Sequence, residues 1–185
     1  MFQRYSQAAA RARVSEGFFL AAIFLIFARP TPGRLAWGTL LALAGVLLRA
    51  ASAGYLEKNQ RLATGGPYAY TRNPLYLGSA LAGTGFAIAG GRWWYLCLLV
   101  AFFGSVYWPV MRNEEAHLRQ SFGKNFDAYA QAVPLLWPRL RPWRAAGAPQ
   151  KGFDWKLYRR NREYEALLAF LAIVLILWGK MLWIG

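Results

Sequence analysis

The first residues suited to chemistry form a segment rich in glycine and tyrosine at residues 65–78. Within it, Asn73 is a favoured N-cap residue and Pro74 suits the first helical turn, so a helix is expected to begin at Pro74. The open N–H groups and positive dipole end of such a helix attract carboxylates and phosphates, and Arg72 adds a fixed positive charge. The segment therefore predicts an anion site. The alternative is that Arg72 and the tyrosines only anchor the helix at a membrane surface.

The second candidate segment covers residues 112–117, where Glu114 and Glu115 stand side by side close after Arg112. Two adjacent carboxylates at the exit of an apolar helix are costly without a cationic or hydroxyl-bearing partner, which makes them candidate ligand acceptors. The alternative is an ordinary helix start, where acids favour the dipole. Glu114 and His117 also form an E-x-x-H pair, as in carboxylate-bridged metal bundles. Because His117 is the only histidine, we expect no metal site.

Five apolar stretches must position these segments, and they predict an all-α integral membrane bundle of about five transmembrane helices. The stretches cover residues 17–28, 35–55, 75–91, 93–111 and 166–184. The first is short for a span, but the turn at residues 30–33 favours a helical hairpin over residues 17–55. No stretch alternates with a period of two residues, so helices are expected rather than a closed barrel.

Composition supports a membrane protein and argues against nucleic-acid binding. Of the 185 residues, 57% are hydrophobic and only 16% are charged, below the quarter or so typical of soluble domains. The net charge is +14, but the basic residues lie between the apolar stretches and form no stripe interleaved with stacking aromatics. Cys97, the single cysteine, lies in an apolar stretch and is expected to be a small buried hydrophobe.

The distribution of Lys and Arg predicts the orientation. If five helices cross the membrane, most basic residues share one side, and the other side holds only Arg29, Arg34, Arg92 and Lys180. The positive-inside rule then places the N-terminus in the cytoplasm and the C-terminus outside, in the cell (inner) membrane.

Smaller patterns divide the chain, taken as a single membrane domain over residues 1–185. The hairpin at 17–55 is followed by a core at 56–138, a basic connector at 139–165 and a C-terminal helix at 166–184. Within the core, apolar residues share one face of an amphipathic cytoplasmic helix expected over residues 113–133, which Gly123 weakens. A second face of small residues predicts close helix packing in the third stretch. It consists of Ser79, Gly83, Ala87 and Gly91.

The two polar segments resemble motifs of a known family. Residues 66–78 are similar to the pattern G-P-Y-x-x-x-R-H-P-x-Y-x-G, and residues 114–134 to E-E-x-x-L-x-x-x-F-G-x-x-[YF]-x-x-Y-x-x-x-V-P. Both patterns are typical of the isoprenylcysteine carboxyl methyltransferase family, membrane enzymes related to phospholipid N-methyltransferases. The resemblance covers residues 49–138, and Asn73 stands where the family has histidine.

The resemblance implies a methyltransferase that uses S-adenosyl-L-methionine at the cytoplasmic membrane face. The acceptor would be lipidic or amphipathic, methylated on a carboxylate or an amine. Arg72 and the helix start would hold the cofactor carboxylate, the two glutamates its amino and hydroxyl groups, and aromatic faces its sulfonium. The expected cofactor-binding residues are Gly66, Pro67, Tyr68, Tyr70, Arg72, Asn73, Pro74, Tyr76, Glu114 and Glu115. Glu115 and Arg112 are the expected catalytic residues.

Other interpretations remain open. A non-enzymatic transporter or assembly subunit is one alternative, although transporters tend to place ionisable residues near the bilayer midplane. A nicotinamide-dependent membrane lipid reductase is another alternative, and the topology does not distinguish it from a methyltransferase. Arg49, near the end of the second stretch, either faces a pocket or reaches to the interface. The expected partners are membrane lipids and the acceptor.

Overall fold

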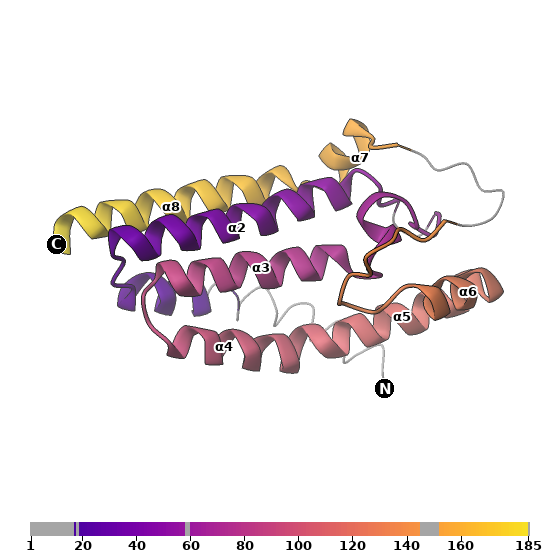
Figure 1. The fold of residues 1–185 in the computed structure, drawn as a ribbon, viewed down its shortest axis with the longest axis horizontal. Coiled ribbons are helices and arrows are strands. Elements are labelled where there is room, and N and C mark those ends of the chain that lie inside the picture. Colours follow the sequence, from indigo (N-terminus) through magenta and orange to yellow (C-terminus); the bar gives the residue numbers. More distant parts are fainter. Residues whose placement is uncertain (1–16, 18, 58–59, 145–151, 185) are drawn as a thin grey trace.

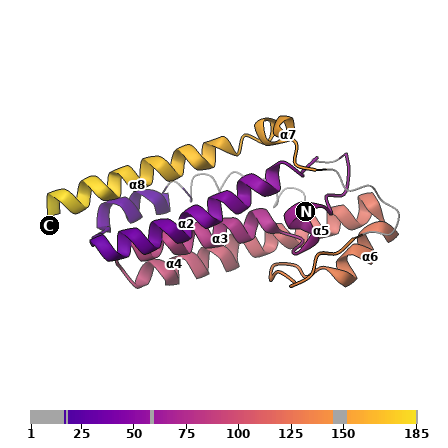
Figure 2. The same cartoon turned by 45° about the horizontal axis from the view of Figure 1, so that its top comes forward.

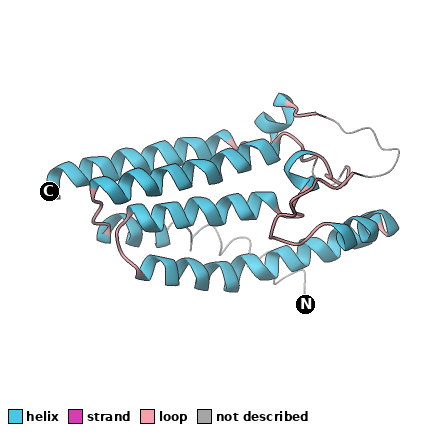
Figure 3. Ribbon diagram, viewed as in Figure 1, coloured by secondary structure: helices cyan, strands magenta, loops and turns pink. Residues whose placement is uncertain are grey.

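A computed structural model describes residues 17, 19–57, 60–144 and 152–184, and within this part the chain is all-helical (Figures 1 and 3). The all-α prediction is therefore confirmed. The helices are α2 (Pro32–Ala53), α3 (Pro74–Ala89), α4 (Trp94–Phe102), α5 (Trp108–Phe122), α6 (Lys124–Ala132), α7 (Trp155–Arg160) and α8 (Tyr164–Ile184). A 3-10 turn, η1 (Gly66–Ala69), precedes α3, and a π-helical segment, η2 (Phe103–Tyr107), joins α4 to α5. Residues 19–27 are also helical.

In the part of the chain that the structure describes, three helices are long and apolar enough to cross a membrane: Pro32–Ala53, the continuous helix Trp94–Phe122, and Tyr164–Trp183. The apolar helix α3 has only 16 residues. The helix at residues 19–27 is shorter still. Length alone therefore supports three of the five expected spans. The apolar helices support a membrane protein.

Helices α2 and α3 pack along a line of small residues with their backbones almost in contact. A Cβ atom added to Gly38 would lie 2.5 Å from the carbonyl oxygen of Gly85, and one added to Gly45 would lie 2.5 Å from that of Gly78. We call this interface the α2–α3 seam; it also includes Ala42, Ala82 and Ala89. Such small residues let helices approach closely in lipid.

The packing face expected from the sequence was wrong in register. Gly83, one of the expected seam residues, faces α4 instead, where a Cβ atom would meet the side chain of Leu99. Gly91 lies in the turn after α3 with a φ of 74°. The face of α3 that packs on α2 consists of Gly78, Ala82, Gly85 and Ala89, at steps of four, three and four residues. Because 3.6 residues complete one helical turn, a strict step of four residues drifts off this face.

The amphipathic helix expected over residues 113–133 has different bounds. Its first part is the end of α5, which continues from the membrane helix without a break, and it stops at Gly123, where φ is 50°. Glycine adopts such a left-handed conformation without strain. The second part, α6, turns back and buries Phe126 and Tyr129. The apolar face was thus predicted correctly, but not the break.

Helix α8 lies alongside α2 (Figures 1 and 2), with Phe170 packed against Ala42 and Val46. Cys97 is exposed on α4, so the expectation of a buried hydrophobe was wrong. The C-terminal end of α8 lies at one end of the bundle, whereas α6 and α7 lie at the opposite end (Figure 1). We call this opposite end the polar end, because both motif segments meet there.

Candidate active site at the polar end

The first motif segment is hydrogen-bonded to the connector that follows α6. We call residues 134–143 the strap. The backbone N–H of Arg72 donates to the carbonyl of Pro134 at 2.9 Å, and the Thr71 hydroxyl donates to that of Leu136 at 2.9 Å. Two further backbone hydrogen bonds, both 2.9 Å long, join the strap to the segment. The N–H of Arg139 donates to the carbonyl of Tyr70, and the N–H of Trp143 donates to the carbonyl of Ala69. The strap therefore holds the first motif beside the end of the second.

Asn73 occupies the N-cap position of α3, and Pro74 is the first helical residue, as the sequence predicted. The expected side-chain cap is absent, however, since the Asn73 amide donates to the carbonyl of Leu135 at 3.0 Å. The amide nitrogen thus fastens the strap, and Asn73 leaves the N–H groups of the first turn uncapped. This end of α3 keeps the electrostatic character of an open helix start.

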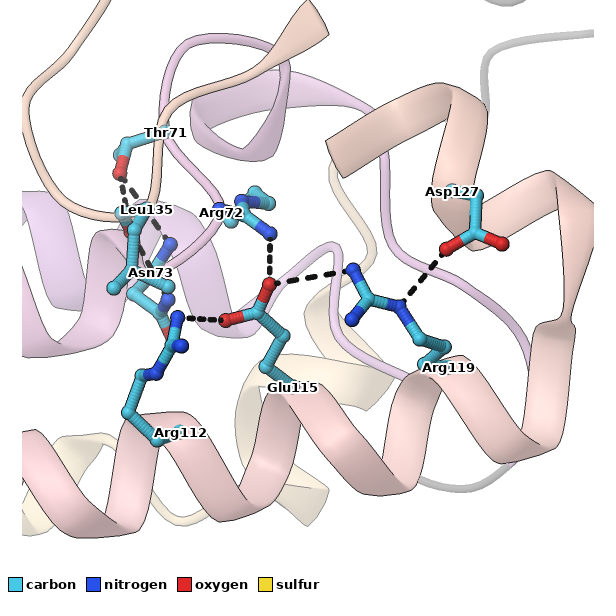
Figure 4. Close-up of polar contacts among 8 residues, drawn as sticks. All are labelled: Thr71, Arg72, Asn73, Arg112, Glu115, Arg119, Asp127 and Leu135. Carbon is cyan, nitrogen blue, oxygen red and sulfur yellow. Dashed lines mark hydrogen bonds and ion pairs between the residues drawn. The ribbon is translucent and has the colours of Figure 1, made fainter. Parts of the chain in front are cut away.

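The centre of the site is an ion pair between the two motifs. Arg72 Nη1 lies 2.7 Å from Glu115 Oε1, and the side chains are only 13% and 12% exposed. Arg112 approaches the other oxygen of Glu115 at 3.0 Å, and Arg119 lies 3.8 Å from Oε1 (Figure 4). One carboxylate therefore faces three guanidinium groups, and the two motifs touch directly.

Arg72 has donor capacity left over. Its Nε atom is buried and has no hydrogen-bond partner among the described residues. A buried donor without an acceptor costs free energy, so such an atom calls for a ligand oxygen or water.

A cavity of about 590 Å³ opens between the helix ends at this site. It collects four of the chain's eight acidic residues, namely Glu57, Glu114, Glu115 and Glu163. Arg49, Arg61 and Arg72 also line it. Carboxylates and guanidinium groups thus face one space, which suits a ligand that itself carries charges of both signs.

Most of the expected site residues lie on the cavity wall. They are Tyr68, Arg72, Asn73, Pro74, Tyr76, Glu114 and Glu115. Gly66, Pro67, Tyr70 and Arg112 do not line it. Gly66 shapes the preceding turn with a φ of 55°, and the Arg112 side chain is 59% exposed and pairs with Glu115.

Two buried tyrosines support the wall from η1 and α6. The Tyr129 hydroxyl donates to the carbonyl of Tyr68 at 2.7 Å. Burial raises the pKa of Tyr68, and the nearby Tyr129, Glu114 and Glu163 raise it further, against a lowering by Arg49. Burial likewise raises the pKa of Tyr129. Both side chains are therefore neutral near physiological pH and serve as hydrogen-bonding groups, not as bases.

Sequence reasoning missed Glu163 and Tyr107 as cavity residues. Glu163 pairs with Arg49 in a bidentate contact, with Nε–Oε2 and Nη2–Oε1 distances of 3.0 and 2.7 Å. The sequence left two orientations open for Arg49, toward a pocket or toward the membrane interface, and in the structure Arg49 lines the cavity. The available signal for Glu163 was a carboxylate three residues before an apolar stretch in a strongly basic chain, a signal that Glu165 shares.

Tyr107 reaches the cavity from the π-helical segment, a kind of distortion that is common at functional sites. Its ring stands edge-on to that of Tyr76, with 5.4 Å between centroids. No local pattern in the sequence marks this residue, because its position depends on the extra residue in the helical turn.

Comparison with known proteins gives partial matches. An 88-residue stretch is 33% identical to the cobalt-zinc-cadmium resistance protein CzcN of Cupriavidus metallidurans, covering 48% of this chain and 40% of that protein. An 89-residue stretch is 32% identical to the nickel-cobalt-cadmium resistance protein NccN of Alcaligenes xylosoxydans xylosoxydans, covering 48% and 41%. The match thus spans less than half the length of either relative. No solved structure matches the chain.

Residues 34–125 match the phospholipid methyltransferase family. This range contains α2 from Arg34 onward, α3 to α5 and both partners of the Arg72–Glu115 ion pair, but neither the strap nor Glu163. On this match the chain belongs to the phospholipid methyltransferase family, within the wider group of membrane methyltransferases that resemble isoprenylcysteine carboxyl methyltransferase.

Proposed function

We propose that this chain transfers a methyl group from S-adenosyl-L-methionine to a lipidic or amphipathic acceptor at the cytoplasmic face of the cell membrane. The observation that carries the proposal is the Arg72–Glu115 ion pair, which joins the two motifs on the wall of one cavity. The excess of Lys and Arg between the apolar stretches supports a cytoplasmic position for this end.

The residues present fit the proposed cofactor. Its carboxylate suits the unpartnered Nε of Arg72 and the open start of α3. Glu114 lies on the same wall and offers carboxylate oxygens to an amino group or to ribose hydroxyls. When bound, S-adenosyl-L-methionine supplies an electrophilic methyl group on a positively charged sulfur.

Aromatic rings on the wall suit that positive charge. Tyr76 and Tyr107 form an edge-to-face pair beside the polar residues, and Tyr68 lines the cavity from η1. A cation over a tyrosine face gains roughly 0.5–2 kcal/mol, with the larger value where water is excluded. The rings therefore favour a sulfonium donor without using a further carboxylate.

Catalysis in such a site consists mainly of holding donor and acceptor in line with water excluded. Glu115 is engaged by three arginines, so its role is to hold Arg72 in place and not to remove a proton. A carboxylate acceptor is already a nucleophile and needs no base. An amine or hydroxyl acceptor needs a proton acceptor on the wall, for which Glu114 is the candidate.

The names of the two relatives refer to metal resistance. Among the described residues, no three His, Cys, Asp or Glu side chains gather into a group that would hold a metal ion. The Arg72–Glu115 ion pair and the family match are the observations that favour methyl transfer for this cavity.

Two experiments test the proposal. Titration calorimetry of the purified protein with S-adenosylhomocysteine and with NADPH is expected to show binding of the first alone. Binding of NADPH would favour the reductase, and binding of neither would favour a transporter or assembly subunit. Incubation with methyl-labelled S-adenosyl-L-methionine and a total lipid extract is then expected to label a lipid species, whose chemistry identifies the acceptor.

A further inference from the structure

The segment that joins α7 to α8 reaches the cavity although it lies outside the residues that match the family. It is fastened to the end of α2. The Asn161 amide donates to the carbonyls of Ala53 and Leu56, both at 2.9 Å, and the Asp154 backbone N–H donates to that of Gly54 at 3.0 Å. We call residues 153–163 the C-terminal clasp. These bonds satisfy carbonyls at the end of α2, so the clasp is an integral part of the fold.

The clasp delivers Glu163 to Arg49, and this ion pair forms part of the wall. Glu163 is 10% exposed and Arg49 is 26% exposed. Arg49 also donates to the hydroxyl of Ser79 at 2.5 Å, so the pair links α2, the first turns of α3 and the last residue before α8. A charge at this depth in an apolar helix requires such a partner.

The pair lies on the same cavity wall as Tyr68, whose side chain is 6% exposed. Glu163 and Arg49 are among the charged groups that act on its hydroxyl, with opposite effects. This part of the wall therefore presents a carboxylate, a guanidinium and a neutral hydroxyl, all of them groups that form hydrogen bonds.

Below the clasp, α8 continues as an apolar helix of membrane length. Leu167 and Leu171 lie one and two turns after Glu163 and are 37% and 48% exposed. A polar pair above an exposed apolar helix face matches the head and chain of an amphiphile. Most residues suited to the cofactor, by contrast, gather at the start of α3 and on α5, and Tyr68, on which both Glu114 and Glu163 act, is shared by the two sides.

We propose that the C-terminal clasp forms the acceptor side of the cavity and that Glu163 is a positioning residue, which acts through Arg49 and Tyr68 on the acceptor's polar head. This inference rests on the proposed function, since it assigns the second substrate of that reaction. The segment outside the family match would then determine which amphiphile is accepted.

A labelling experiment tests the location without requiring turnover. Cys97→Ser removes the native thiol, and Leu56→Cys then places a reporter on the cavity wall beside Asn161. A total lipid extract is expected to slow maleimide labelling of this reporter by about tenfold, whereas S-adenosylhomocysteine changes the rate less than about twofold. With Glu163→Gln added, the lipid protection is lost. Retained protection in that variant would overturn the proposal.

Kinetics with the same lipid extract give a second readout. Glu163→Gln is expected to raise the lipid KM by roughly tenfold, the loss expected for a charge-assisted hydrogen bond, while the dissociation constant of S-adenosylhomocysteine stays within about twofold. Glu163→Asp should recover part of the loss. The matched control is Glu165→Gln, because Glu165 is 53% exposed and pairs only with Arg162 among the described residues.

The outcomes separate the two proposals. If the wild-type protein transfers no methyl group to any lipid, the proposed function fails, and protection at Leu56→Cys still decides whether the clasp binds an amphiphile. If Glu163→Gln weakens S-adenosylhomocysteine binding, or behaves like Glu165→Gln, the assignment of Glu163 to the acceptor side is wrong.

Discussion

The α2–α3 seam and the polar end hold helices together in opposite ways. In the seam, backbones lie so close that a Cβ atom on Gly38 or Gly45 has no room. At the polar end, long charged side chains bridge the helices and leave a cavity of about 590 Å³ between them. The difference shows that the seam fixes where the helices lie, and the polar end uses that fixed frame to hold a binding site.

The two regions meet at Gly78. A Cβ atom there would lie 2.7 Å from Cγ of Arg49, so the small residue that closes the seam also makes room for an arginine of the cavity wall. The comparison therefore predicts that changes in the seam damage the fold, and that changes at the polar end damage binding while the fold persists.

The largest effect is expected in the seam. Gly45→Val places methyl groups where the backbone of Ala82 lies, and should destabilise the protein by about 3 kcal/mol or more, with loss of S-adenosylhomocysteine binding as a consequence. Unfolding in mixed detergent micelles measures this. Gly179→Ala in α8 is the control, because nothing lies within 4 Å of the added atom. Equal stability of both variants would contradict the description of the seam.

The next effect concerns the central ion pair. Arg72→Ala and Glu115→Gln should each weaken S-adenosylhomocysteine binding by about tenfold or more, because a charged donor to the ligand is lost or released from position. Calorimetry measures the affinity, and the melting temperature in detergent shows whether the fold persists. Arg112→Ala is the comparison, since Arg112 is largely exposed and lies outside the cavity lining. An effect of Arg112→Ala as large as that of Arg72→Ala would place Arg112 back among the essential residues.

A smaller effect concerns pH. The pKa values of Tyr68 and Tyr129 are raised in the folded protein, so the unfolded chain loses these protons first. Stability should therefore be insensitive to both groups below about pH 10 and should fall as the pH rises further, by up to about 1.4 kcal/mol per pH unit for each group. Unfolding at pH 9 and 11 measures the slope. Tyr129→Phe should reduce it, and an unchanged slope would show that Tyr129 ionises freely.

The smallest effect is expected at the surface. Arg119 Nε lies 2.9 Å from Asp127 Oδ1 across the break at Gly123, but the side chains are 55% and 47% exposed. An exposed ion pair contributes at most about 1 kcal/mol. Asp127→Asn should therefore change neither S-adenosylhomocysteine affinity nor the melting temperature by a measurable amount. A clear loss of affinity would show that this surface ion pair contributes to the binding site.

Much of the fold was predictable because it follows from local patterns. The apolar stretches predicted the helices, Pro74 predicted the start of α3, and the spacing of Phe126 and Tyr129 predicted the buried face of α6. The register of the seam was missed, although α2 carries the complementary series Gly38, Ala42 and Gly45. Only the pairing of two such faces distinguishes the true face from a neighbouring one.

The sequence by itself determined the class of the protein and the chemistry available to it. Hydrophobicity, helical periodicity, capping and backbone preferences all act over a few residues. Each of these signals can therefore be interpreted from a single segment of the sequence. The tertiary structure alone decided that Glu115 meets Arg72, that Asn73 bonds the strap and that Glu163 pairs with Arg49 on the cavity wall. These contacts join residues as far apart as 43 positions for Arg72 and Glu115 and 114 for Arg49 and Glu163. Which charges meet over such separations depends on how the helices pack, and no local pattern carries that information.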